Sequence, residues 1–371
     1  MPTEMIPFFN IKSENDAYAK AYTKELSLFL ESGQYILGDA VTTFEQEFAA
    51  FCGTDFCVGT SNGLDALRLI FEGYKSLGIL TEGDEVLVPA HTYIATVLAV
   101  IQANLTPVFV EPTDGSFGMD VNEARRLTSS KTKACLVVHL YGELIDVEAF
   151  QDFAQQHNLL LIEDAAQAHG AVSKKGFKAG AIGNAGAFSF YPTKNIGALG
   201  DAGAVTTNSN ALEKQIRILQ NYGSPKKYTH DTLGFNMRLD ALQARFLSVR
   251  LNDYQHVLER RLVIASRYAN EIKNPKIILP VHPQDKSHVF HLFVVRVADR
   301  TGFMAFLEAN NVGSLIHYPT PPHKQKALQD FNSLSLPVTE RYHEEVVSIP
   351  LYSSLNDAEV QHIIDALNAY L

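Results

Sequence analysis

One lysine of this sequence lies where a lysine can react with an aldehyde. Lys194 follows the apolar run 186–190 and precedes a segment, 197–203, that holds three glycines. A lysine in a tight, partly desolvated turn loses its proton more readily and can attack a carbonyl carbon. Most loop lysines simply face solvent, but Pro192 and the glycines allow the backbone to approach a ligand closely. The segment therefore predicts a nucleophilic lysine.

A carboxylate ends another apolar run 30 residues earlier. Asp164 follows the run 159–162 and is itself followed by small residues and Gln167. A carboxylate at a strand end can pair with a protonated pyridine nitrogen, which makes the ring an electron sink. Asp164 could also cap a following helix. Because Asp164 precedes Lys194 by 30 residues, we favour the role of partner to a cofactor's ring nitrogen over that of a helix cap.

Two earlier turns have residues that suit a flat, phosphorylated ligand. Ser61, Asn62 and Gly63 separate a strand from a helix, and the first N–H groups of a helix bind phosphate well. The same residues are also an ordinary helix cap. Tyr93 follows the run 85–88, where its ring could stack on a cofactor or join the core.

The apolar runs that deliver these residues lack alternation, as strands buried on both faces do. With helical segments between them, they predict an α/β fold with a large, mainly parallel sheet, and ligands collect beyond the carboxyl ends of such strands. The expected strands are 56–58, 85–88, 107–110, 134–139, 159–162, 186–190 and 202–206.

The remaining segments predict a second, smaller domain. Helical spacing is found at 16–30, 211–221, 239–266, 303–310 and 357–370, and one alternating run predicts a strand at 289–297. We predict a large domain over residues 1–250, including an N-terminal helix, and a smaller α+β domain over 251–371.

Composition excludes several classes of partner. The net charge is −10 and the sequence has no basic run, so we expect no nucleic acid. No apolar stretch approaches ~20 residues and no signal peptide is visible, so we expect a cytoplasmic protein without a membrane partner. The three cysteines predict buried, reduced thiols. No metal is expected, because the C-terminal histidines lack metal-site spacing; they are His282, His288, His291, His317 and His323.

In this order, these features resemble those of the DegT/StrS sugar aminotransferases, a branch of the pyridoxal 5'-phosphate (PLP) enzymes of fold type I. The resemblance covers essentially the whole chain. It implies that Lys194 is the Schiff-base lysine and proton carrier, and that Asp164 pairs with the ring nitrogen of PLP. It also implies that Tyr93 stacks on the ring and Gln167 lies near the ring hydroxyl. The implied phosphate ligands are Ser61, Asn62, Gly63 and Ser189.

The segment 234–243 resembles another hallmark of this family. There, Asn236 would reach the cofactor phosphate of a partner subunit, which implies a homodimer with shared active sites. By the same resemblance, the residues facing the substrate are Tyr191, Tyr222, His317 and Tyr318.

One position indicates a subgroup. Tyr191 stands where many members that aminate carbon 4 carry a histidine, and 195–203 resembles the members that act on TDP-linked 3-oxo-6-deoxyhexoses. The expected product is a TDP-3-amino-3,6-dideoxyhexose, of the kind used in lipopolysaccharide, S-layer glycans and macrolide sugars, with L-glutamate as donor. The alternatives are a 4-oxo aminotransferase, a sugar 3-dehydratase, which would carry His in place of the lysine, and a non-catalytic regulator.

Overall fold

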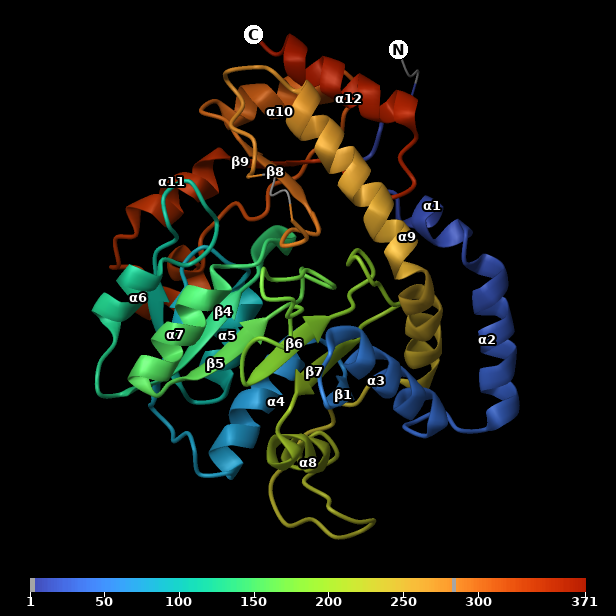
Figure 1. Ribbon diagram of the computed structural model, residues 1–371, viewed down its shortest axis with the longest axis vertical. Helices are drawn as coiled ribbons and strands as arrows, with labels where there is room; N and C mark the ends of the chain where they lie inside the picture. The colour runs from blue at the N-terminus through green and yellow to red at the C-terminus, as the bar shows by residue number, and fades with distance from the viewer. Residues whose placement is uncertain (1–3, 282–284) are drawn as a thin grey trace.

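The computed structural model describes residues 4–281 and 285–371. A seven-stranded sheet forms its centre, in the order β1-β7-β6-β5-β4-β2-β3 (Figure 1). All seven predicted strands are confirmed. Only β7 runs antiparallel to its two neighbours, so β1 and β6 point the same way as β2 to β5. The strands are β1 (Phe56–Thr60), β2 (Glu85–Pro89), β3 (Thr106–Val110), β4 (Thr132–Val138), β5 (Leu160–Asp164), β6 (Ala185–Ser189) and β7 (Gly203–Thr207).

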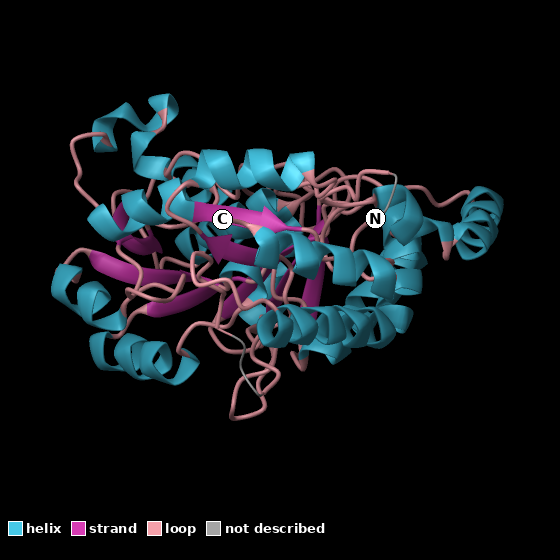
Figure 2. Ribbon diagram, turned by 90° about the horizontal axis from the view of Figure 1, so that it is seen from above, coloured by secondary structure: helices cyan, strands magenta, loops and turns pink. Residues whose placement is uncertain are grey.

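Helices cover both faces of the sheet, which explains why the strands lack alternation (Figure 2). Within β5, Leu161 packs into the core of one face and Ile162 into the core of the other. The first core includes residues of α3 (Asp39–Cys52), α6 (Val121–Leu127) and α7 (Val147–His157). The second includes residues of α4 (Gly63–Ser76), α5 (Ile94–Gln102) and α8 (Asn210–Leu219).

One long helix links the sheet to the C-terminal part of the chain. The helix α9 (Ala241–Glu271) contributes Leu247 to a core of the sheet and Tyr268 to a separate C-terminal core. Figure 1 shows it running from beside α3 up to α12. Residue 250 lies inside this helix, and the division of the chain at that residue stays a prediction.

The C-terminal part is a small α+β layer. Its strands β8 (Phe293–Arg296) and β9 (Val346–Ile349) pair antiparallel. The predicted strand at 289–297 is too long, because the N–H of Val289 instead donates to the Gly142 carbonyl in a loop. The accompanying helices are α10 (Arg300–Ala309), α11 (Pro337–Glu345) and α12 (Asp357–Ala369), with short 3-10 helices η2 (Pro322–Lys324) and η3 (Lys326–Phe331).

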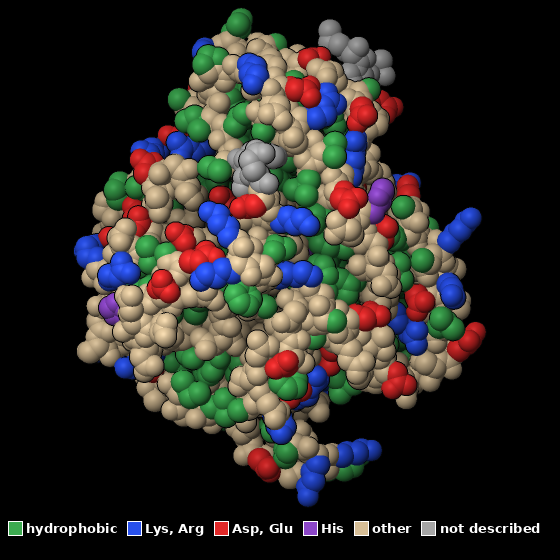
Figure 3. Space-filling model, in the orientation of Figure 1, with side chains coloured by type: hydrophobic (Ala, Val, Ile, Leu, Met, Phe, Trp, Pro, Cys, Tyr) green, Lys and Arg blue, Asp and Glu red, His purple; other side chains and the backbone are tan. Residues whose placement is uncertain are grey.

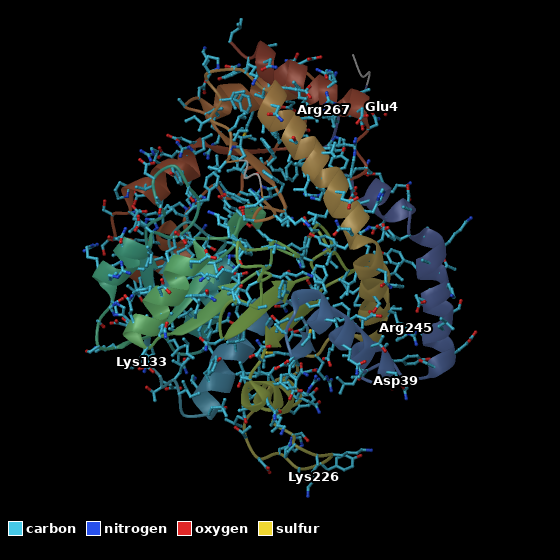
Figure 4. All side chains as sticks on the ribbon, viewed as in Figure 1. Glu4, Asp39, Lys133, Lys226, Arg245 and Arg267 are labelled. Atoms are coloured by element: carbon cyan, nitrogen blue, oxygen red, sulfur yellow. The ribbon has the colours of Figure 1, made fainter. Side chains whose placement is uncertain are left out.

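The predicted N-terminal helix is two helices, α1 (Ile11–Asp16) and α2 (Ala19–Ser32). The break occurs where the Tyr18 hydroxyl donates to the Asp253 carboxylate of α9, at 2.5 Å. The helix α2 then lies along α9, where Glu25 pairs with Arg245 at 3.0 Å (Figure 4).

The surface carries charges of both signs. On the face in Figure 3, acidic and basic side chains are interspersed and form no continuous basic area. Within the described residues, no helix is both long and apolar enough to cross a bilayer. The three cysteines are free and buried.

Candidate active site

A pocket of about 550 Å³ opens at the carboxyl ends of the strands. Asn62 follows β1, Tyr93 follows β2, Asp164 is the last residue of β5 and Ser189 is the last residue of β6. Because these strands all point the same way, their ends meet at one edge of the sheet. The pocket therefore collects residues that are far apart in the sequence.

At one end of the pocket, the start of α4 presents backbone N–H groups. The Asn62 side chain caps the helix by accepting from the Asp65 N–H at 2.9 Å. A Cβ at Gly63 would lie 2.7 Å from the Ser189 Cβ, so only glycine lets the helix begin this close to β6. The first N–H groups of a helix have no intrahelical partner and favour an anion. This end of the pocket suits a phosphate.

Lys194 lies in a tight turn beyond β6. The Lys194 N–H donates to the Tyr191 carbonyl at 2.8 Å, with Pro192 at the position where its fixed φ suits such a turn. A Cβ on Gly197 would lie 2.4 Å from the Pro192 carbonyl oxygen, so the loop can fold back on the turn only with glycine there. Burial lowers the pKa of the Lys194 amine to about 8, and the Asp164 carboxylate opposes that shift. At neutral pH a useful fraction of the amine is unprotonated.

Asp164 faces the same pocket and is nearly buried. The Thr96 hydroxyl donates to its Oδ2 at 2.8 Å and the Ala166 N–H to its Oδ1 at 3.2 Å. Burial raises the pKa of Asp164, whereas these two hydrogen bonds and the Lys194 charge lower it. Asp164 does not cap a helix, because no helix lies between β5 and β6. Its carboxylate instead lines the pocket.

Two aromatic rings in contact, those of Tyr93 and Tyr318, bound another side of the pocket. The Tyr93 and Tyr318 ring centroids are 4.9 Å apart. The Gln167 amide donates to the Tyr318 hydroxyl at 3.1 Å, and its carbonyl accepts from the Tyr141 N–H at 2.5 Å. Gln167 therefore has a fixed orientation beside Tyr318.

Two histidines line the pocket on the C-terminal side. His317 Nδ1 lies 2.9 Å from the Ser348 hydroxyl, and burial lowers its pKa to about 4. His291 Nδ1 lies 3.1 Å from Asn195 Oδ1, and burial also lowers the His291 pKa. Both imidazoles are neutral at physiological pH, so neither adds a positive charge near Lys194.

The structure brings ten of the thirteen predicted site residues into this pocket. They are Asn62, Gly63, Tyr93, Asp164, Gln167, Ser189, Tyr191, Lys194, His317 and Tyr318.

The other three predicted residues, Ser61, Tyr222 and Asn236, do not line the pocket of their own chain. The Ser61 hydroxyl donates to Asp65, whereas Tyr222 and Asn236 are exposed on a neighbouring loop. There, the Tyr222 N–H donates to the Phe235 carbonyl at 2.8 Å.

Thr96 and His291 are among the residues of the pocket wall that sequence reasoning missed. Thr96 lies one helical turn after Tyr93, a spacing that could have indicated it. His291 belongs to a segment that was predicted as a strand and offers no such signal. Of the histidines considered for a metal, His282 lies outside the described residues. The described ones include no group of three or more His, Cys, Asp or Glu side chains arranged to hold a metal.

The pocket fits PLP. It combines an anion site at the start of α4, an amine of lowered pKa, a carboxylate and an exposed aromatic ring. These groups match the phosphate, the aldehyde, the ring nitrogen and the ring face of that cofactor. The close contact of Gly63 with Ser189 brings two of the predicted phosphate ligands together.

Comparisons with known proteins agree with this geometry. The family described as DegT/DnrJ/EryC1/StrS aminotransferase matches residues 17–368. The dTDP-3-amino-3,6-dideoxy-alpha-D-galactopyranose transaminase of Aneurinibacillus thermoaerophilus is 47% identical over 366 residues and 99% of both chains.

Solved structures agree as well. DesV of S. venezuelae, in complex with a ketimine intermediate, is 40% identical, with a TM-score of 0.95 over 99% of this chain and 98% of that one. The ntda protein of Bacillus subtilis, with bound cofactor PMP, is 29% identical, with a TM-score of 0.91 over 99% of this chain and 85% of that one. The predicted fold class and cofactor are confirmed.

Proposed function

Because the chain belongs to the DegT/DnrJ/EryC1/StrS aminotransferase family, we propose that it aminates carbon 3 of a dTDP-linked 3-oxo-6-deoxyhexose. The product would be a dTDP-3-amino-3,6-dideoxyhexose, with L-glutamate as the amino donor. The observation that carries the proposal is that Lys194 and Asp164 line one pocket, in a chain 47% identical to a transaminase of that specificity.

The residues of the pocket have separate roles in the proposed reaction. When bound, PLP supplies an aldehyde and a ring that takes up electrons. Asp164 holds a proton on the ring nitrogen, and Lys194 Nζ takes and returns the proton that moves during transamination. A pKa of about 8 lets Lys194 do both near neutral pH. Asn62 and Ser189 hold the phosphate, which fixes the cofactor relative to the lysine.

Tyr191 supports the choice of carbon 3. It lines the pocket three residues before Lys194, on the turn that carries the amine. A phenol there is longer than the imidazole of many 4-aminating members and offers a different hydrogen-bonding group. Since a misplacement of ~1 Å can cost ~10²-fold in rate, this side chain can bias which carbonyl reaches the cofactor.

A substrate panel tests the proposal. Purified protein is given glutamate with the 3-oxo sugar, in both configurations at carbon 4, or with the 4-oxo sugar, and kcat/KM is compared. We expect the highest value for a 3-oxo sugar and a weakened preference in Tyr191→Phe. A preference for the 4-oxo sugar would overturn the assignment to carbon 3. Absence of turnover with every sugar, and of any spectral response to glutamate, would favour a regulator.

Thr96 offers a test of how Asp164 is held. In Thr96→Val, Asp164 loses a hydrogen bond that lowers its pKa, so its pKa rises. Less of the carboxylate is then ionised at a given pH, and the acidic limb of kcat/KM against pH moves to higher pH. At neutral pH we expect a loss of about tenfold, the effect of one hydrogen bond to a charged group.

The control for Thr96 is Thr92→Val. The Thr92 hydroxyl bonds to the Thr96 hydroxyl, at 3.0 Å, whereas Thr96 bonds to Asp164 itself. Thr92→Val should therefore shift the acidic limb less. An unchanged acidic limb in Thr96→Val would mean that Thr96 only packs against Asp164.

We also propose a homodimer with shared active sites, which the charge of the pocket supports. Lys194 is the one lysine or arginine among the described residues that line the pocket. The two phosphates of a dTDP-sugar need positive partners. Tyr222, Lys226 and Asn236 are exposed in the segment between α8 and α9. Lys226 lies on the part of this segment that projects below α8, where a second copy would receive it (Figures 1 and 4).

Subunit mixing tests this arrangement. Lys194→Ala chains and Asn236→Ala chains should each have little activity alone. After exchange, each mixed dimer has one site with both residues intact, so roughly a quarter of the wild-type activity should return. Mixing Lys194→Ala with Asp164→Asn is the control, because both residues belong to the pocket of one chain and no activity should return. No recovery in the first mixture, with exchange verified, would place Asn236 in its own chain's site or in a structural role.

A further inference from the structure

Two buried residues behind the pocket hold the backbone of its C-terminal wall. Tyr141, in η1 (Leu140–Gly142), donates its hydroxyl to the His317 carbonyl. His343, in α11, lies with Nδ1 2.7 Å from the Tyr318 carbonyl. Neither Tyr141 nor His343 lines the pocket, and both are almost fully buried.

The direction of each hydrogen bond follows from the acceptors. A carbonyl can only accept, so Tyr141 and His343 are both donors. The Tyr141 oxygen then accepts from His91 Nε2 at 3.1 Å. Burial lowers the pKa of His91 and lowers that of His343 to about 4, so each imidazole is neutral and has one N–H. The N–H of His91 therefore donates to the Tyr141 oxygen, and the N–H of His343 donates to the Tyr318 carbonyl.

The side chains of the same segment are held as well. His317 contacts Ser348, and Tyr318 is held by the Gln167 amide and the Tyr93 ring. The carbonyl contacts come from η1 and α11, and the side-chain contacts come from β9 and from the segments that follow β2 and β5. The 317–318 segment is therefore fixed from both sides.

We propose that Tyr141 and His343 are positioning residues that set where His317 and Tyr318 meet the keto-sugar. This inference rests on the proposed function. Loss of either donor leaves a part-buried carbonyl without its partner, and we expect the segment to shift to satisfy it. Since a shift of ~1 Å can cost ~10²-fold in rate, sugar turnover should respond strongly to residues that never touch the sugar.

The first test is Tyr141→Phe, which removes one hydroxyl and keeps the ring. Transamination proceeds in two half-reactions, so kcat/KM for the keto-sugar and for glutamate are measured separately. We expect kcat/KM for the sugar to fall by about tenfold or more, and that for glutamate by less than about threefold. Tyr268→Phe is the matched control, because Tyr268 is also buried and donates to the Pro350 carbonyl, at 2.8 Å, away from the pocket.

The second test uses His343. Leucine removes the donor, whereas asparagine places an N–H near the position of Nδ1. We expect the selective loss of sugar turnover in His343→Leu and its partial recovery in His343→Asn. If Tyr141→Phe does not fold, the comparison of His343→Leu with His343→Asn tests the positioning role by itself. Equal losses in both half-reactions, or no loss, would overturn the inference. Wild-type turnover of the sugar, measured first, separates this failure from a failure of the proposed function.

Discussion

Lys194→Ala is expected to reduce turnover by at least ~10²–10⁴-fold, the contribution of general acid–base catalysis alone. The variant loses the amine that binds the cofactor's aldehyde and also the group that moves the proton. Among the described residues that line the pocket there is no second lysine to replace it. The cofactor should still bind without a covalent bond, through the start of α4 and Asp164. Steady-state rates and the retention of PLP on gel filtration measure the two effects.

The control for this substitution is Lys175→Ala. Lys175 is exposed on the loop between β5 and β6, away from the pocket, and its loss should leave both rate and cofactor unchanged. Addition of the aminated product to Lys194→Ala should alter the cofactor's absorbance without turnover. Normal turnover by this variant would refute the role of Lys194.

Asp164→Asn should retain the fold and lose well over tenfold in rate. Asparagine has nearly the same shape and can keep the contacts with Thr96 and Ala166, so the pocket should stay intact. A neutral amide cannot hold a proton on the ring nitrogen, and the ring then accepts electrons poorly. The measurements are kcat/KM for glutamate and the unfolding temperature of the variant.

Asp152→Asn serves as the matched control, since Asp152 is exposed on α7 and does not line the pocket. It should change neither quantity. If Asp164→Asn loses less than a factor of ten in rate, the carboxylate only orders the turn after β5, through its bond with the Ala166 N–H.

Much of the fold was predictable from local sequence. Strands buried on both faces need continuous apolar runs, and all seven runs of the central sheet were found on that ground. The long helix α9 was recognised from its spacing. The N-terminal break and the short β8 were not, because the contacts of Tyr18 with Asp253 and of Val289 with Gly142 join distant segments. No local pattern encodes those partners.

For the candidate site, the sequence by itself determined which residues end the strands and where glycine is needed. The reason is local: Asp164 and Ser189 follow apolar runs, and small residues next to a turn indicate close backbone approach. Only the tertiary structure decided which of these residues share a pocket. It also revealed Thr96, which binds Asp164 across 68 residues, and Tyr141 and His343 behind the pocket. Such contacts depend on strand order and on the packing of the C-terminal layer, and the spacing of residues along the chain does not determine either.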